Sequence, residues 1–392
     1  MKLPDAGWQR RPGMDALRRA LGADEGLTRY VGGCVRDTLL GLEASDIDLA
    51  TRLEPAEVIR RLQEARIKAV PTGLAHGTVT AVSAGHPVEV TTLRRDVSTD
   101  GRRATVAFSD DWREDAARRD FTINALSADP ATGELFDYFG GLADLKARRV
   151  RFIGDPLQRI AEDHLRILRF FRFHARFGAG AAPDPDALAA CSTRANDLMA
   201  LSRERIADEL LKLLSLPDPA ATLATMIERA ILRPVLPEIV SSRGLARLVG
   251  REREAGVAAD PIRRLAALLP PDQALAERVA ARLRLSKKQT QLLASACDPQ
   301  LAAPHRLAYR IGPEEAVSRL LLREGDPAGL RELQSWHRPR LPVGGGDLVQ
   351  AGIKAGPEVA RLLRRIEAQW VDEGFPPAPR VREIMAEVLA KR

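Results

Sequence analysis

The sequence has few cysteines, few aromatic residues and no long hydrophobic run. Its three cysteines, Cys34, Cys191 and Cys297, lie far apart in the 392 residues, which gives neither a disulfide framework nor a zinc-ligand cluster. Aromatic residues make up only 4% of the chain. No apolar stretch approaches the roughly 18 residues that a membrane span needs. A metal ion, if the protein uses one, must therefore be held by carboxylates.

The chain also shows no apolar leader and no strong excess of one charge. The N-terminal segment MKLPDAGWQRRPGMDALRRALG carries arginines and acids where a secretory signal has an apolar stretch, so we expect a cytoplasmic protein. The 60 basic and 53 acidic residues leave a formal charge of +7. This charge permits a polyanionic partner such as nucleic acid, but arginines far outnumber lysines and compositional bias explains it equally well.

Strand patterns occur in the N-terminal part of the chain and helical patterns in the rest. Short strand-like runs predict strands over 28–31, 47–50, 78–82 and 87–93. Residues 83–86 are expected to form the hairpin turn between the last two. From Asp155 onward the hydrophobic residues recur with helical spacing, as in residues 157–178 and 279–296. The phenylalanines of the first of these segments are expected to pack in the core.

These patterns predict an α+β fold with a small sheet and its helices in a head, followed by an all-helical remainder. Breaks rich in Pro, Gly and Asp fall at 178–185, 216–219, 270–271 and 342–347. We divide the chain into four parts, which are a head (1–147), a neck (148–215), a body (216–335) and a tail (336–392).

A glycine pair followed by two aspartates is the first motif with chemical content. Gly32 and Gly33 follow a strand-like run, and Asp46 and Asp48 come after the next helix-compatible segment. Residues two apart on a strand point to the same face, so the two acids should project together. Their repulsion is relieved by a divalent cation, and Mg²⁺ prefers such oxygen ligands. The glycines would let the backbone approach a triphosphate, whose charge Arg36 would help to neutralise.

This order of motifs resembles the nucleotidyltransferase superfamily that includes DNA polymerase β, in which a glycine pair and a helix precede Asp-x-Asp. The resemblance implies a polymerase-β-like head with two Mg²⁺ ions held by Asp46 and Asp48. A third carboxylate is usual on a neighbouring strand. Glu89 fits this position, because Val88 and Val90 would pack inward while Glu89 faces outward. A solvated strand acid remains the alternative for Glu89.

Four further stretches narrow the resemblance to the class II tRNA nucleotidyltransferases, the CCA-adding enzymes. They are RRDFTINAL (118–126), LFDYFGGLADL (135–145), RIAEDHLRILRFFRFHARFG (159–178) and SRERIADELLKLL (202–214). The similarity is close over about residues 28–215 and only fold-level beyond. It implies the addition of C, C and A to the 3′ end of tRNA from CTP and ATP, with pyrophosphate released. The basic helical C-terminal part would bind the tRNA.

The third stretch can also be interpreted without the family. Asp163 and Arg166 are three residues apart, so on one helix they would share a face. A carboxylate only accepts and a guanidinium only donates hydrogen bonds. Cytosine and adenine present an amine donor beside a ring-nitrogen acceptor, whereas uracil and guanine present the reverse. Such a pair would select C and A, although an ordinary surface salt bridge between the two residues explains the spacing as well.

The resemblance assigns roles to the remaining site residues. It implies that Glu162, Asp163 and Arg166 act as a protein template for the incoming base, and that Arg169 and Arg172 face the nucleotide. The residues implied to hold the ribose and connect head to neck are Arg119 and Asp120, with support from Asn124.

Several alternatives stay open. Bacterial poly(A) polymerases share the head motifs, but residues 68–82 (KAVPTGLAHGTVTAV) lack their basic stretch. An enzyme that adds only CC or only A is disfavoured, because the flexible segment 96–120 resembles that of enzymes that add all three nucleotides. A noncatalytic RNA-binding module is the least favoured alternative, because both aspartates are present. No histidine is followed by Asp, so a second, phosphohydrolase activity is not predicted. The sequence does not reveal the oligomeric state.

Overall fold

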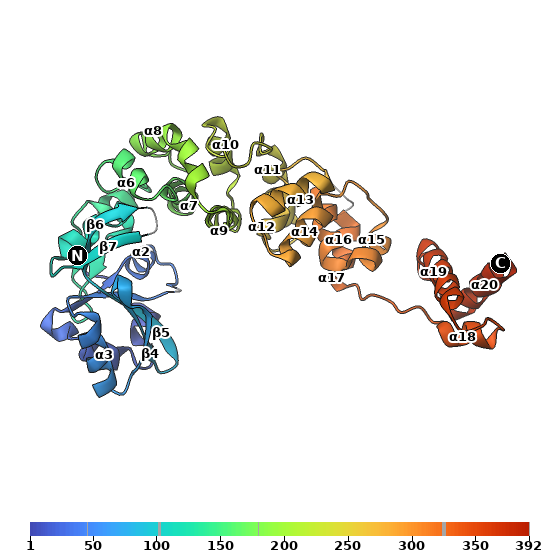
Figure 1. Cartoon of the computed structure of the whole chain (residues 1–392), viewed down its shortest axis with the longest axis horizontal. Coiled ribbons are helices and arrows are strands. Elements are labelled where there is room, and N and C mark those ends of the chain that lie inside the picture. The colour runs from blue at the N-terminus through green and yellow to red at the C-terminus, as the bar shows by residue number, and fades with distance from the viewer. Residues whose placement is uncertain (45, 101–102, 179, 324–326, 392) are drawn as a thin grey trace. The chain divides into compact units, whose positions relative to one another are not determined.

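The structure is a computed structural model that describes residues 1–44, 46–100, 103–178, 180–323 and 327–391. The chain divides into two compact units, which Figure 1 colours along the sequence. The first unit comprises Met1–Leu213 with Glu228–Val235, and the second comprises Leu214–Ile227 with Leu236–Arg392. The first contains the sheet and the second is helical, as the α+β prediction requires. The finer division into head, neck, body and tail stays a prediction.

A seven-stranded mixed sheet forms the centre of the first unit. The strand order is β3-β4-β5-β2-β1-β8-β9, in which β2 and β5 are parallel and the other neighbours antiparallel. The bounds are β1 Thr28–Val31, β2 Asp48–Thr51, β3 Lys68–Gly73, β4 Thr78–Ser83, β5 His86–Thr92, β8 Ser127–Ala128 and β9 Leu135–Phe136. The four predicted strands are confirmed within a residue or two, whereas β3, β8 and β9 were not predicted.

The hairpin between β4 and β5 has a two-residue turn. Ser83 pairs with His86, and the intervening Ala84 and Gly85 have φ angles of 48° and 85°. Two consecutive positive φ values are the geometry that matches the right-handed twist of a tight hairpin. This turn confirms the predicted connection and sets the register that brings Thr80 opposite Glu89.

Short helices and a second small sheet complete the head. The helices are α1 Met14–Ala20, α2 Gly33–Leu39, α3 Pro55–Glu64, α4 Trp112–Ala117 and α5 Gly141–Lys146. Fully buried side chains such as Leu17, Tyr30, Leu49 and Leu62 form the core between these helices and the sheet. The segment predicted to be flexible forms part of strands β6 (Arg94–Asp100) and β7 (Arg103–Phe108) and all of α4. Residues 101–102 of that segment lie outside the described residues.

The described part of the first unit continues with helices α6 Pro156–Glu162, α7 Arg166–Phe177 and α8 Pro185–Thr193 and with α9 Arg203–Leu214, whose last residue already belongs to the second unit. A cluster of rings fixes α7 on the head, because Phe121 lies 5.2 Å from Phe173 and 4.9 Å from Phe152, measured between ring centroids. Phe170 and Phe171 are fully buried, which confirms the prediction that these phenylalanines pack in the core.

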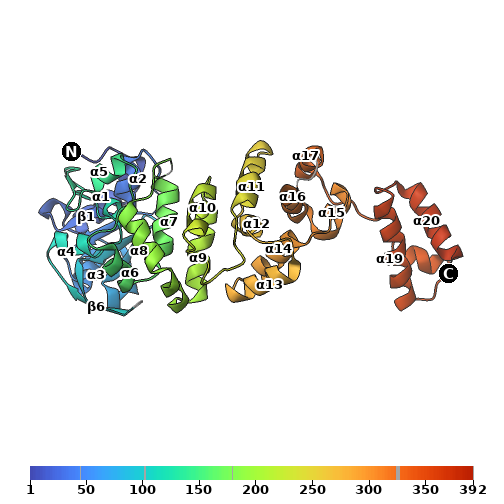
Figure 2. The ribbon, with the colours of Figure 1, turned by 90° about the horizontal axis from the view of Figure 1, so that it is seen from above.

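The second unit consists of helices. They are α10 Ala220–Glu228, α11 Arg243–Glu254, α12 Pro261–Ala266, α13 Gln273–Arg282, α14 Lys287–Cys297, α15 Pro304–Ile311, α16 Pro313–Leu322, α17 Pro327–Ser335, α18 Gly345–Gln350, α19 Pro357–Asp372 and α20 Ala378–Ala390. The continuous helical pattern over 279–296 is interrupted, since Ser286 caps the start of α14 and Figure 2 shows α13 and α14 as separate helices. In the described part of the chain, no helix combines the length and apolarity needed to span a membrane.

Candidate active site

Two of the predicted acids meet on adjacent parallel strands. Asp48 opens β2 and stands directly opposite Glu89 of β5 in the register. The alternating neighbours Ile47 and Leu49 are buried, as are Val88 and Val90, so the acids project from the opposite face. Asp46 precedes β2 and is exposed. The predicted position of Glu89 on a neighbouring strand, with its side chain outward, is therefore confirmed.

The acids influence one another electrostatically. Burial and, to a smaller extent, the charges of Glu89 and Asp46 together raise the pKa of Asp48 to about 6, against the opposing charge of Arg119. No three His, Cys, Asp or Glu side chains of the described residues converge into a metal-binding group. The fit to a divalent cation therefore rests on chemistry: hard oxygen donors of like charge whose repulsion a cation would relieve. Asp46 and Asp48 meet this requirement.

The raised pKa of Asp48 predicts a pH-dependent stability. Because this carboxyl binds a proton more tightly in the folded chain, its charged form costs stability above about pH 6, and the cost fades as the pH falls toward its ordinary value of 3.8. Without divalent ions, we expect Asp48→Asn to raise the free energy of unfolding by on the order of 2 kcal/mol at neutral pH and by almost nothing below about pH 4.

Urea unfolding with a chelator present, followed from about pH 4 to 8, measures this difference. Added Mg²⁺ should then stabilise the wild-type protein more than the variant. An equal gain for both proteins, or a variant less stable at neutral pH, would contradict the electrostatic argument.

The glycine turn lies beside this acid pair. Gly32 has φ 71° and ψ −123°, and its N–H donates to the carbonyl of Leu126 at 3.0 Å. A Cβ atom at this position would lie 3.1 Å from Nη1 of Arg119. Arg119 also donates to Asp115 at 3.2 Å. The missing side chain of Gly32 thus leaves room for the arginine whose charge acts on Asp48.

This packing predicts a specific effect of Gly32→Ala. A non-glycine residue at positive φ is strained by about 1–3 kcal/mol, and the new methyl group would also displace Arg119. We expect incorporation of nucleotides to fall by about tenfold to a hundredfold, since small displacements at reacting groups have effects of this size. Gly41→Ala is the control, because Gly41 has φ 69° with nothing within 4 Å of its added Cβ. Equal activity loss in both variants would refute the Arg119 contact as the cause.

Arg36 is buried within an internal network. Its guanidinium donates to Asp37 at 2.7 Å and to Asn124, and its Cζ lies 4.1 Å from the ring centre of Phe177. Burial lowers the pKa of Arg36, and the neighbouring Asp37 opposes this change. Only 5% of Arg36 is exposed, so a triphosphate would have to enter this network to reach it.

Asp120 joins the head to α7. One oxygen of this buried carboxylate accepts from Asn124 Nδ2 and from the Phe121 N–H, both at 2.9 Å. The other accepts from Nε and Nη2 of Arg169 at 2.9 and 2.5 Å. Burial alone would raise the pKa of Asp120, but the charge of Arg169 and these hydrogen bonds lower it below its ordinary value.

The residues that were predicted to act as a template do not lie on one continuous helix. Asp163 has φ −152° and ψ 107°, so α6 ends at Glu162 and α7 begins at Arg166. The prediction that Asp163 and Arg166 share a helix face, and could form an ordinary i,i+3 salt bridge, is therefore wrong. Asp163 pairs instead with Arg205 at 2.7 Å and Arg166 with Glu162 at 2.6 Å.

Arg169 and Arg172 do lie on one helix, α7, three residues apart. Arg172 donates to Glu209 of α9 at 2.6 Å, and Arg169 lies 3.9 Å from the same carboxylate. Glu209 is only 4% exposed. Both arginines thus carry an internal anionic partner.

Sequence reasoning missed the partners of these residues. Asp37 contacts Arg36, Arg205 contacts Asp163, and Glu209 contacts both Arg172 and Arg169. None of these three partners was assigned a role. Arg205 and Glu209 belong to the stretch 202–214 that was singled out, at positions four apart on a helix. That spacing places both on one face, which was the available signal.

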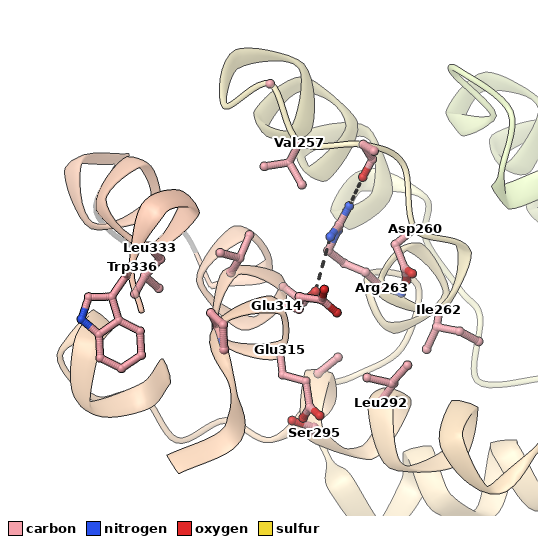
Figure 3. Close-up of a pocket in the computed structure, with 16 residues that line it drawn as sticks. Val257, Asp260, Ile262, Arg263, Leu292, Ser295, Glu314, Glu315, Leu333 and Trp336 are labelled. Carbon is pink, nitrogen blue, oxygen red and sulfur yellow. Dashed lines mark hydrogen bonds between the residues drawn. The ribbon is translucent and has the colours of Figure 1, made fainter. Parts of the chain in front are cut away.

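A separate cavity of about 620 Å³ lies in the second unit between α11, α12, α14, α16 and the end of α17. Figure 3 shows Val257, Ile262, Leu292 and Trp336 among its apolar lining, with Arg263 donating to the carbonyl of Ala258 and to Ser318. None of the residues predicted for the active site lines it.

A glycine turn beside an acid pair on adjacent strands of a mixed sheet defines a nucleotidyltransferase head. Comparison with known proteins agrees: residues 28–151 match the family model "Poly A polymerase head domain", and residues 182–242 match "Probable RNA and SrmB- binding site of polymerase A". The chain is 35% identical to CCA tRNA nucleotidyltransferase 1, mitochondrial, of Mus musculus, over 93% of this chain and 87% of the relative. The protein belongs to the family of CCA tRNA nucleotidyltransferases.

Other relatives support the same membership. A CCA-adding enzyme of Limosilactobacillus fermentum is 33% identical over 88% of each chain. The crystal structure of the Bacillus stearothermophilus CCA-adding enzyme in complex with CTP superposes with a TM-score of 0.77, at 28% identity, over 97% of this chain and 98% of that one. The Thermotoga maritima CCA-adding enzyme complexed with tRNA shares the fold, with a TM-score of 0.69 at 20% identity, over 96% of this chain and 95% of that one.

Proposed function

We propose that the protein adds C, C and A in turn to the 3′ end of tRNA, using CTP and ATP and releasing pyrophosphate, without a nucleic-acid template. The observation that carries this proposal is that Asp48 and Glu89 lie opposite each other on adjacent parallel strands. The charges of Asp46 and Arg119 also influence the pKa of Asp48. Family membership over nearly the whole chain supports the substrate assignment. The relatives found with CTP, with ATP and with tRNA point to the same three partners.

In this mechanism, Asp46 and Asp48 would hold two Mg²⁺ ions. Such ions would supply positive charge that favours ionisation of the terminal 3′-hydroxyl and stabilises the leaving phosphates. Glu89 helps to orient the hydroxyl from the adjacent strand. Gly32 and Gly33 allow the triphosphate to approach the backbone.

The arginines and their partners bind and orient the nucleotide. Arg119 and Asp120, with Asn124, hold the ribose and keep the head attached to α7. Arg36, Arg169 and Arg172 contribute positive charge toward the triphosphate, each from a side chain already fixed by an acid or amide. A charge fixed before the reaction stabilises developing charge without reorganising at the moment of transfer.

Base selection falls to Glu162, Asp163 and Arg166. Asp163 would accept from the amine of cytosine or adenine, and Arg166 would donate to the adjacent ring nitrogen. Uracil and guanine would leave both protein groups unpaired, and this type of mismatch gives strong discrimination. Glu162 holds Arg166 through the ion pair described above.

The second unit would bind tRNA by phosphate contacts, so the affinity should fall with added salt. Candidate residues on its surface are Arg282, Arg284, Lys287, Lys288, Arg364 and Arg365. The cytoplasm is the compartment that we propose for this protein, whereas the relative from Mus musculus is named as mitochondrial.

The test is incorporation of each of the four labelled nucleoside triphosphates into tRNA that lacks its 3′ terminus. We expect C and A to be incorporated and the product to stop after three additions. A long adenylate tail would identify a poly(A) polymerase, and a stop after one or two additions would identify a partial enzyme. Failure of all four triphosphates, with tRNA still bound, would leave a noncatalytic RNA-binding module.

A further inference from the structure

The turn between α6 and α7 places Asp163 outside both helices. Its Oδ1 accepts from the Leu165 N–H at 3.1 Å, and its Oδ2 accepts from Nη2 of Arg205 on α9 at 2.7 Å. The side chains are only 24% and 16% exposed, so water competes weakly for this ion pair. The carboxylate is thus held at both oxygens, by the main chain on one side and by a cation on the other.

Arg166 is held separately. Its Nη1 donates to Glu162 at 2.6 Å and to the carbonyl of Arg159 at 2.9 Å. A carboxylate has about four acceptor positions and a guanidinium five N–H donors, so both groups keep capacity for a base. Asp163 and Arg166 are therefore oriented by two independent sets of contacts.

We propose that Arg205 is a positioning residue for base selection, which fixes Asp163 as an acceptor for the amine of cytosine or adenine. This inference rests on the proposed function, because it takes Asp163 to meet the base. A carboxylate bound to a guanidinium can only accept, and it cannot turn away from its partner without losing a charge-assisted hydrogen bond. Without Arg205, only the Leu165 N–H would still hold the carboxylate, which could then rotate away from the orientation in which it accepts from the base amine.

Arg205 acts through Asp163, so its loss should change selectivity more than turnover. We expect Arg205→Gln to lower the ratio of CTP to UTP affinity by about tenfold or more, because a hydrogen bond to a charged group has an effect of this order. The KM for CTP should rise while kcat changes little. Arg205→Lys keeps the positive charge and should restore the ratio to within about threefold of wild type.

A matched control lies on the same helix. Lys212 pairs with Asp208 at 2.6 Å, and both side chains are more than half exposed. Lys212→Gln removes the same charge from α9 and should leave the CTP to UTP ratio unchanged, since exposed pairs contribute little. A purely structural role of α9 would instead reduce the affinity for all nucleotides alike.

The measurement is equilibrium binding of CTP, ATP, UTP and GTP to the full-length protein with MgCl₂ and without tRNA. An unchanged ratio in Arg205→Gln, or a ratio that Arg205→Lys does not restore, would overturn the inference. Should the Gln variant not fold, Arg205→Lys alone decides: a selectivity that stays near wild type supports the inference, and one that collapses overturns it. Because binding is measured without tRNA, a failure of three-nucleotide addition counts against the proposed function only.

Discussion

We expect Asp48→Asn to reduce nucleotide incorporation into tRNA by about 10³-fold or more. The amide cannot supply the negative charge that a divalent cation needs, and stabilisation of transition-state charge by such ions amounts to several kcal/mol, with about 1.4 kcal/mol for each factor of ten. Asparagine has nearly the shape of aspartate. The loss should therefore come from charge and not from misfolding, all the more since the substitution relieves the repulsion with Glu89.

The matched control is Asp24→Asn, which removes an exposed carboxylate from the same unit. Its incorporation rate should equal that of the wild-type protein within about twofold. Single-turnover measurements at saturating CTP separate the chemical step from binding. If Asp48→Asn retained more than a tenth of the wild-type rate, Asp48 could not be a metal ligand in the reaction.

The second large effect is a loss of stability, which we expect on substitution of Glu252 of α11 in the second unit. This carboxylate is 3% exposed. Its Oε1 forms an ion pair with Arg263 and its Oε2 with Arg264, both of α12, at N–O distances of 2.7 and 2.8 Å. Arg264 also donates to the carbonyls of Leu214 and Leu216. Removing one member of a buried ion group leaves the others uncompensated and costs about 3–5 kcal/mol. We expect Glu252→Ala to destabilise the second unit by this amount.

Hydrogen exchange measured by mass spectrometry can assign this loss to one unit. Peptides from α11 and α12 should exchange faster in Glu252→Ala, whereas peptides from β2 and β5 should keep their wild-type rates. Glu254→Ala removes an exposed acid from the same helix and should change the exchange rates of neither set of peptides. Equal acceleration in both units would show that they unfold together and would contradict a local role for Glu252.

The local patterns of the head were sufficient to predict its central strands. β-branched runs and the tight turn at residues 84–85 depend on neighbouring residues only, and all four predicted strands are present. β3, β8 and β9 were not predicted, because β8 and β9 have two residues each and β3 contains only two β-branched residues. The break in the helix at Asp163 was not predicted either, because the hydrophobic pattern continues through this position although its backbone is extended.

The residue types of the candidate site were also predictable, but their partners were not. The alternation around Glu89 was sufficient to place this acid on the strand beside Asp48, whereas Asp46 lies before β2 begins, and its shared orientation with Asp48 stays a prediction. Arg36, Arg169 and Arg172 were predicted to face the nucleotide or to neutralise its charge, without any prediction of their protein partners. Each of them donates to a residue that is distant in the sequence, namely Asn124, Asp120 and Glu209. Pairs such as Arg169 with Asp120 and Arg172 with Glu209 arise from tertiary packing, which sequence periodicity does not encode.

The ion pairs of α7 have a consequence for the entropy of nucleotide binding. Long arginine side chains that move freely in solution lose rotamer freedom when a ligand immobilises them, at about 0.5–1.5 kcal/mol each. In this protein, Asp120 and Glu209 impose that ordering during folding, before any nucleotide arrives. Preorganised guanidinium groups should therefore favour rapid exchange between successive nucleotides at a site of constant shape.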